Sequence, residues 1–212
     1  MGKKAAQAPY HHGDLRHALL LAAAKLVEAE GVEALTLREL ARRVGVSHAA
    51  PAHHFGDKAG LLAELAADGF ESLGRRLTEC AVGRVGGEKR LAEVGRAYIE
   101  FARAQPGHYR IMFGRALEEA AKSPRLAEAG AGAFRALEEA VMSALPAKAR
   151  DSPDNAREAA FLAWSAVHGA SMLILDNAVL SDLAPMGDER ALSALVQALT
   201  GAVAYSVATR KK

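Results

Sequence analysis

Residues 36–62 have the sequence TLRELARRVGVSHAAPAHHFGDKAGLL, which contains two short helical patterns on either side of Gly45. Thr36 followed by Glu39 has the spacing of a capping box, in which each side chain satisfies an unpaired backbone N–H at a helix start. Gly45 is expected to end the first helix, because glycine adopts the left-handed conformation of a helix terminus at no steric cost. The stretch therefore predicts two short helices joined by a tight turn.

Such a pair of helices is typical of a DNA-binding helix-turn-helix. Ala41 lies four residues before Gly45, at a point where only a small side chain fits between crossing helices. Leu40, Val44 and Val46 are expected to face the core. An ordinary helical hairpin is the alternative, because this spacing also occurs in proteins that bind no DNA.

The second helix is expected to begin at Ser47 or His48, one of which would cap it. Pro51 lacks an N–H and is tolerated only near a helix start, so this helix must be short. Asp57 is expected to cap the helix that follows.

Three histidines, His48, His53 and His54, lie within seven residues of one another. A zinc site on a helix needs ligands at i and i+4 with further acidic or cysteine ligands, and neither the spacing nor the neighbours provide them. A catalytic histidine would need a paired nucleophile, and Ser47 is better explained as a helix cap. We therefore expect no metal and no catalytic residue, and assign the histidines to a surface that contacts another molecule.

The rest of the 212-residue chain shows helical periodicity and no alternating β pattern. We predict an all-α fold of about nine helices, with a three-helix helix-turn-helix domain in residues 1–60 and a larger helical domain in residues 61–212. The net charge is +2, and the positive surplus lies entirely in residues 1–60, which hold eight Lys and Arg against six Asp and Glu. This distribution permits binding to a polyanion.

Composition and motifs argue against several classes of protein. Cys80 is the only cysteine, so a reducing compartment fits best, and we expect a cytoplasmic protein. The N-terminus lacks the apolar segment of a secretory signal, and polar residues interrupt the longest apolar stretch, so no membrane association is expected. There is no phosphate loop, nucleophile–base pair, paired carboxylates or metal-ligand spacing, and we expect neither a cofactor nor an enzyme.

Residues 10–62 resemble the TetR family of transcriptional repressors, in the branch that opens with YHHGDLR. The matching motifs stand at Tyr10–Arg16, Leu37–Ser47, Ala49–Pro51, His54–Phe55, Asp57–Lys58 and Leu61–Leu62. A weaker similarity, to the Trp-His-Gly ligand domain of that branch, occurs in WSAVHG at Trp164–Gly169. The resemblance implies a sequence-specific regulator, expected to be a repressor released by a small-molecule effector. The alternative is an all-helical small-molecule-binding protein or enzyme with a structural N-terminal hairpin.

Contacts with double-stranded DNA are expected around the second helix of the motif. His48, Ala49 and Ala50 would meet base edges in the major groove, with the alanines on thymine methyl groups. Thr36 would present a helix N-terminus to a phosphate. The residues expected to contact DNA are Thr36, Arg38, Ser47, His48, Ala49, Ala50, His53, His54 and Lys58.

Three of these positions compare directly with the family motif. His53 resembles a base or backbone contact, and His54 and Lys58 resemble phosphate contacts, although His54 packed half-buried beside Phe55 is an alternative. The chain departs from the family at Ala52, where a tyrosine hydroxyl usually contacts phosphate. The loss of one hydrogen bond would weaken binding by about 1 kcal/mol.

Residues 61–212 are expected to form a homodimer, because one helix-turn-helix reads only one half-site. The candidate interface consists of a long apolar helix over residues 153–179 and a last helix over residues 189–208. In the family these helices form a four-helix bundle with their copies. A monomer that buries both helices internally is the alternative.

Most aromatic residues of the chain lie between positions 98 and 164, in the larger domain. At helical spacing they are more often core than pocket, but the resemblance implies an effector site among them. The candidate ligand-binding residues are Tyr98, Phe101, Tyr109, Met112, Phe113, Phe134, Trp164, His168 and Met172. His168 could orient a ligand, or it could be a hydrogen-bonded residue of the core.

Overall fold

The structure, a computed structural model, describes residues 12–81, 87–117, 123–144 and 153–176 and the helical residues 193–194, 196–198 and 200–202. Every regular element in these ranges is a helix, which confirms the all-α prediction. The α-helices are α1 (His12–Glu30), α2 (Leu37–Val44), α3 (Ala49–Phe55), α4 (Lys58–Ala81), α5 (Glu88–Ala104), α6 (Pro106–Met112), α7 (Pro124–Ala144) and α9 (Pro153–Leu175). Two short 3-10 helices, η1 (Val32–Ala34) and η2 (Arg115–Leu117), connect them.

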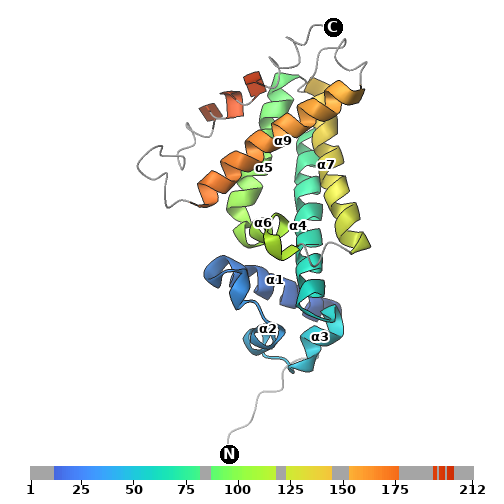
Figure 1. The fold of residues 1–212 in the computed structure, drawn as a ribbon, viewed down its shortest axis with the longest axis vertical. Coiled ribbons are helices and arrows are strands. Elements are labelled where there is room, and N and C mark those ends of the chain that lie inside the picture. Colours follow the sequence, from blue (N-terminus) through green and yellow to red (C-terminus); the bar gives the residue numbers. More distant parts are fainter. Residues whose placement is uncertain are drawn as a thin grey trace, which may run out of the picture.

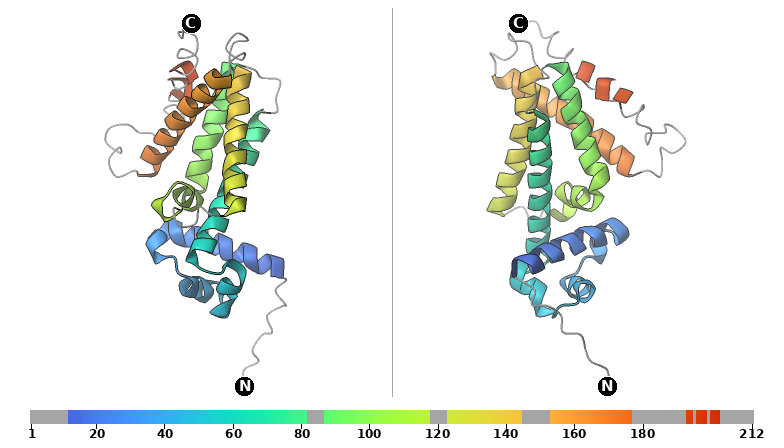
Figure 2. Two further views of the ribbon diagram at one scale, coloured as in Figure 1. Left: turned by 45° about the vertical axis from the view of Figure 1, so that its right-hand side comes forward. Right: turned by 180° about the vertical axis from the view of Figure 1, so that it is seen from behind.

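The helices form two parts that share α4 (Figure 1). The N-terminal part consists of α1, α2 and α3, and the C-terminal part packs α5, α6 and α7 along α4, with α9 lying on α5 and α7. Figure 2 shows α4 passing from one part into the other in two further views. Most buried apolar residues of both parts belong to one cluster. The boundary expected at residue 60 falls in the first turn of α4 and stays a prediction.

The turn between α2 and α3 has the expected geometry. Gly45 has φ 74°, and its N–H donates to the Ala41 carbonyl, while Leu40 and Ala41 are fully buried. Thr36 Oγ1 accepts a hydrogen bond from the Glu39 N–H at 3.1 Å, which is half of the predicted capping box. The other half does not form, because the Glu39 carboxylate is bound by arginines of its own helix.

The start of α3 differs from the expectation, and the start of α4 agrees with it. His48 is the residue before α3, but no side chain makes a capping hydrogen bond there. Asp57 Oδ1 accepts a hydrogen bond from the Gly60 N–H at 2.8 Å and so caps α4 as predicted. A Cβ at Gly60 would fall on the Phe55 carbonyl oxygen. The sharp turn from α3 into α4 therefore requires glycine at this position.

A second close approach joins α1 to the C-terminal part. Gly107, in the first turn of α6, is buried against α1, and a Cβ there would fall on the Ala24 carbonyl oxygen. Because α6 also packs on α4, it holds α1 and α4 together.

Helix α9 lies across α5 and α7. It is observed to Leu175, and most of the predicted last helix, like Ser152, lies outside the described residues. The stretch Arg157–Leu175 is long and apolar enough to cross a membrane by length and composition, a test that core helices of soluble proteins also pass, and 33% of it is buried in this structure. Apolar side chains stay exposed on it, among them Phe161, Leu162 and Leu173.

Candidate DNA-binding surface and ligand cavity

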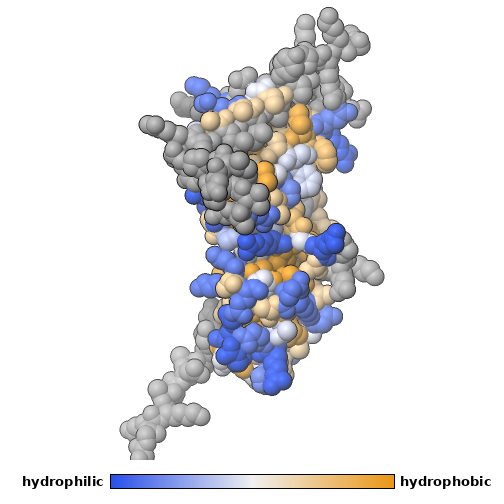
Figure 3. All heavy atoms as spheres, turned by 60° about the vertical axis from the view of Figure 1, so that its left-hand side comes forward, coloured by the Kyte–Doolittle hydropathy of each residue, from blue (hydrophilic) through white to orange (hydrophobic). Residues whose placement is uncertain are grey.

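The first candidate site is the exposed surface at the starts of α2 and α3. Figure 3 shows hydrophilic residues over much of the end of the molecule that the N-terminal part forms. Six of the nine predicted DNA contacts have exposed side chains: Thr36, Arg38, Ser47, His48, Ala49 and His53. Ala50, His54 and Lys58 are half-buried. The surface is therefore accessible to a large partner.

The histidines divide into two kinds. His48 and His53 are exposed, while His54 is half-buried between its neighbours. The His54 ring centroid lies 5.7 Å from that of His53 and 6.0 Å from that of Phe55. In the part of the chain that the structure describes, no group of three His, Cys, Asp or Glu side chains could hold a metal ion. His54 is thus placed to pack beside Phe55, with an edge towards the surface.

Lys58 has a structural bond as well as a charge. Its Nζ donates to the Val32 carbonyl at 3.1 Å, which ties η1 to the first turn of α4. An ammonium has three N–H donors, so donors remain for a phosphate. The cation is held in a fixed position instead of moving on a free side chain.

The arginines at the end of α2 have their charge compensated. Glu39 accepts hydrogen bonds from Arg42 Nε at 2.8 Å and from Arg43 Nε at 2.8 Å, and Arg43 also pairs with Glu30. The hydrogen bonds from Arg42 and Arg43 lower the pKa of Glu39 to about 2. The carboxylate is therefore ionised at neutral pH, and neither arginine is a free cation.

The second candidate site is a cavity of about 1070 Å3 between α4, α5, α7 and α9. Its lining residues are Phe70, Leu73, Leu77, Tyr98, Phe113, Gly130, Ala131, Ala133, Phe134, Leu137, Arg157, Glu158, Phe161, Leu162, Trp164 and Ser165. This volume is ample for a drug-sized ligand, since such sites measure about 300–1000 Å3.

Four of the nine predicted ligand-binding residues line the cavity: Tyr98, Phe113, Phe134 and Trp164. The other five lie outside its lining: Phe101, Tyr109, Met112, His168 and Met172. Phe101 is fully buried, which makes it a core residue. Sequence reasoning missed Phe70, Leu73 and Leu77 on α4, because their helical spacing is the same for a core stripe as for a cavity wall.

Four side chains form a polar cluster at the cavity wall: Tyr98 and Trp164, which line the cavity, and Tyr109 and His168, which lie outside its lining. Trp164 Nε1 donates to the Tyr98 hydroxyl at 3.1 Å, and the Tyr109 hydroxyl lies 2.7 Å from His168 Nδ1. Burial raises the pKa of both tyrosines and lowers the pKa of His168, so all four side chains are uncharged at neutral pH. His168 is thus half-buried and hydrogen-bonded, and its role in orienting a ligand stays a prediction.

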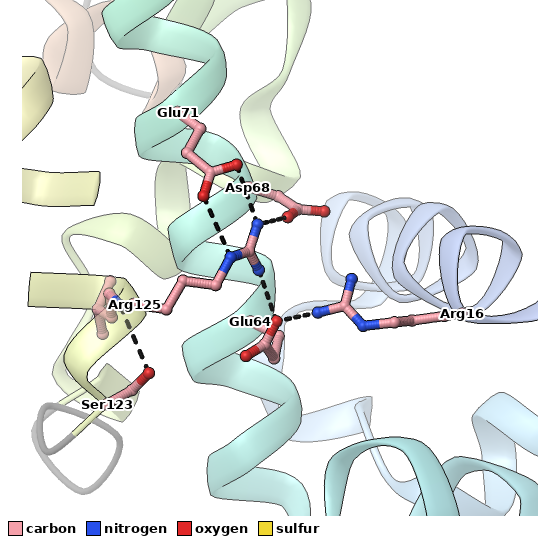
Figure 4. Close-up of polar contacts among 7 residues, drawn as sticks. Arg16, Glu64, Asp68, Glu71, Ser123 and Arg125 are labelled. Atoms are coloured by element: carbon pink, nitrogen blue, oxygen red, sulfur yellow. Dashed lines mark hydrogen bonds and ion pairs between the residues drawn. The ribbon is translucent and has the colours of Figure 1, made fainter. Parts of the chain in front are cut away.

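A network of ion pairs links the two parts of the molecule (Figure 4). Arg125, at the start of α7, binds three carboxylates on α4: Glu64 at 2.5 Å, Asp68 at 2.5 Å and Glu71 at 2.9 Å. The same Glu64 oxygen also pairs with Arg16 of α1. We call this set the Arg125 bridge. It connects a helix of the cavity wall, through α4, to the N-terminal part.

Two family descriptions match the chain. One, "Bacterial regulatory proteins, tetR family", covers residues 19–65, and the other, "Tetracyclin repressor-like, C-terminal domain", covers residues 91–199, more than half of the chain. The protein belongs to the TetR family. It is therefore a DNA-binding transcriptional regulator, as the resemblance predicted. No curated protein matches the chain.

Solved structures agree with the TetR fold. A protein of unknown function from Rhodococcus sp. RHA1 is 30% identical, with a TM-score of 0.72, and the match covers 94% of this chain and 98% of that one. A transcriptional regulator from the same organism is 23% identical, with a TM-score of 0.69 and coverage of 90% and 96%. The fatty-acid regulator FadR from Bacillus subtilis, solved with stearoyl-CoA, is 13% identical, with a TM-score of 0.68 and coverage of 89% and 97%. The last two similarities show the fold alone.

Proposed function

We propose that this TetR-family protein is a cytoplasmic, homodimeric repressor that a small molecule in the cavity releases from DNA. The observation that carries the proposal is that one helix serves both sites. Phe70, Leu73 and Leu77 of α4 line the cavity, and the first turn of the same helix holds Lys58 and packs on α3. A ligand that displaces α4 would therefore move α3.

The DNA-facing residues have distinct roles in this proposal. His48 and Ala49, exposed at the start of α3, contact base edges in the major groove, and Ala50 lies beside them. Thr36 and Lys58 contact phosphates, which position the protein without reading sequence. His54, half-buried beside Phe55, presents its ring edge to the DNA backbone. His53 contacts a base or the DNA backbone, and Ser47 and Arg38 contact the DNA backbone.

The dimer forms through an exposed stripe on α9. Leu162, Ala166, Gly169 and Leu173 follow one another at spacings of four, three and four residues, so they share one face. All four are at least partly exposed, and a Cβ at Gly169 would meet no atom within 4 Å. Small residues in the middle of the stripe allow a second helix to approach closely. The α9 of a second copy fits this face.

The Arg125 bridge transmits the signal from the cavity. Gly130, Ala133 and Phe134 of α7 line the cavity, and Arg125 of the same helix binds Glu64, the carboxylate shared with α1. A ligand that pushes α7 outward strains these ion pairs. Coupling between two such sites is typically about 1–3 kcal/mol, a 5- to 150-fold change in DNA affinity.

We also propose that the chain belongs to the Trp-His-Gly branch. Trp164, His168 and Gly169 stand on adjacent turns of α9, with Trp164 on the cavity and His168 in the polar cluster. In this arrangement Trp164 forms part of the cavity wall, His168 supports that wall through the polar cluster, and Gly169 allows a second helix to approach closely.

The test is a gel shift with the DNA segment upstream of the protein's own gene, repeated over a range of salt concentrations. Binding to that segment in preference to random DNA, with a steep loss of affinity as salt rises, is the expected result. Light scattering on the same sample, with Gly169→Arg as the variant, tests the dimer. Equal affinity for random DNA, or a monomer of the unchanged protein, would contradict the proposal.

A further inference from the structure

The cavity wall is unusually rich in aromatic rings. Six of its lining residues are aromatic: Phe70, Tyr98, Phe113, Phe134, Phe161 and Trp164. The whole chain has six Phe, four Tyr and one Trp, so more than half of its aromatic residues are at this one site. They come from α4, α5, α7, α9 and the segment after α6, and so surround the cavity instead of lining one side. Rings of a ligand would find edge-to-face and stacked partners in several directions.

The wall offers no site for a charged group inside. Arg157 and Glu158 are the only charged lining residues in the described part of the chain, and both are exposed, adjacent and opposite in sign. An ion moved from water into an apolar cavity without a partner loses its hydration at a high free-energy cost. The part of a ligand that enters the cavity must therefore be uncharged.

The polar groups of the wall are largely satisfied by one another. The Trp164 N–H donates to the Tyr98 hydroxyl, and the Ser165 hydroxyl donates to the Phe161 carbonyl at 2.8 Å. Burial raises the pKa of Tyr98, so its hydroxyl stays neutral. A ligand would consequently gain little from hydrogen bonds here, and its shape and rings would decide its affinity.

From these three observations we propose that the cavity binds an uncharged polycyclic aromatic molecule. The proposal deepens the function proposed above, on which it rests only in treating that molecule as the effector. It commits to one chemical class. Anionic amphiphiles and saturated aliphatic chains are the competing classes.

A matched pair of probes tests the charge of the ligand. N-phenyl-1-naphthylamine is uncharged, and 1-anilinonaphthalene-8-sulfonate has the same ring skeleton with one sulfonate added. Trp164 is the only tryptophan of the chain and lies in the wall, so its fluorescence reports binding at the site. We expect the uncharged probe to quench Trp164 and to bind at least about tenfold more tightly than the sulfonate, because only the sulfonate must bury a charge. Equal or tighter binding of the sulfonate would overturn the proposal.

A third probe tests the preference for rings. Dodecanol is uncharged and apolar but has no ring. It should displace N-phenyl-1-naphthylamine only weakly, since it gains burial of apolar area without ring contacts. If dodecanol displaced the aromatic probe at concentrations as low as those at which the probe itself binds, the proposed preference for aromatic ligands would be wrong.

Two glycines of α7 supply the matched variants. Gly130 lines the cavity and a Cβ there would meet no atom within 4 Å, while Gly132 lies on the opposite groove, where the nearest atom to a Cβ is Arg135 Nη2 at 3.7 Å. Gly130→Leu should fill part of the cavity and lower the affinity for the uncharged probe at least about tenfold. Gly132→Leu should leave that affinity unchanged. Both changes favour helix, so both variants should fold. Equal effects of the two variants would place the probe elsewhere and overturn the assignment.

DNA affinity separates this proposal from the proposed function. If the uncharged probe binds tightly in the cavity but DNA affinity stays the same, the ligand class stands and the release mechanism fails. If the sulfonate binds more tightly and releases DNA, the ligand class fails and the release mechanism stands.

Discussion

The N-terminal part and the cavity are both built from α-helices, but one presents its side chains on an exposed surface and the other presents them to an internal space. In the N-terminal part, proposed DNA contacts such as Thr36 and His48 are exposed at the starts of short helices, and two glycines shape the turns between the helices. In the cavity, lining side chains such as Tyr98 and Trp164 come from long helices far apart in the sequence. A surface for a large partner can be built from one short stretch, but an enclosure for a small one needs several elements.

The junction between the two regions determines whether they can influence each other. It contains the Arg125 bridge and the close approach of Gly107 to Ala24. One contact depends on charge and the other on shape. Substitutions at Gly107 and Arg125 separate these two contributions.

Gly107→Ala should disrupt the junction through a steric clash. The added Cβ would fall on the Ala24 carbonyl oxygen, and overpacking of this kind costs about 1–3 kcal/mol of unfolding free energy. DNA affinity should fall as well, because α1 must move. Urea unfolding and gel shifts measure the two effects. Gly130→Ala, which meets no neighbouring atom, is the control and should gain about 0.5–1 kcal/mol. An unchanged Gly107→Ala protein would show that α6 does not hold α1.

Arg125→Gln should weaken the junction because it removes ion pairs. It removes the Arg125 ion pairs of Glu64, Asp68 and Glu71, and we expect a loss of about 1–2 kcal/mol in unfolding free energy, since the bridge is only partly exposed. Arg135→Gln, an exposed arginine of the same helix, should change it by less than about 0.5 kcal/mol.

A double-mutant cycle with Arg16→Gln tests whether Glu64 couples α1 to α7. The two changes should be non-additive, because both arginines neutralise the same carboxylate oxygen. Additive effects, to within about 0.5 kcal/mol, would mean that the two ion pairs are independent.

Lys58→Gln should lower DNA affinity by a similar factor on every sequence and reduce the salt slope by about one, because Lys58 is proposed to meet a phosphate. Arg103→Gln removes the same charge from the exposed end of α5 and should leave the slope unchanged. Titrations at several salt concentrations give both slopes. A base-specific loss of affinity would instead assign Lys58 to sequence reading.

The polar cluster should give the smallest effect, as a dependence of stability on pH. Burial lowers the pKa of His168 below its ordinary value of 6.5, so the unfolded chain binds the proton more readily. Unfolding free energy should therefore fall as the pH drops below about 6.5, by less than about 1.4 kcal/mol per pH unit, the limit for one proton. His168→Asn keeps an acceptor without titrating in this range and should flatten the slope, leaving the part due to His108. An unchanged slope would rule out His168.

The features that the sequence predicted correctly are those that a few neighbouring residues determine. The cap at Thr36, the turn at Gly45 and the cap at Asp57 were predicted correctly because a few neighbouring residues determine each of them. The second half of the capping box was wrong, since Glu39 found stronger partners in Arg42 and Arg43. The cap at the start of α3 failed as well, because His48 has helical dihedral angles and makes no such bond.

The sequence by itself determined the helices, the helix-turn-helix and the family, because periodicity and turn residues act over a few positions. Only the tertiary structure decided that Tyr98 faces the cavity while Phe101 lies in the core, and that Arg16 and Arg125 meet at one carboxylate. Those relations depend on the angles at which distant helices pack. Such angles result from the sum of many weak contacts, which no single stretch of the chain encodes.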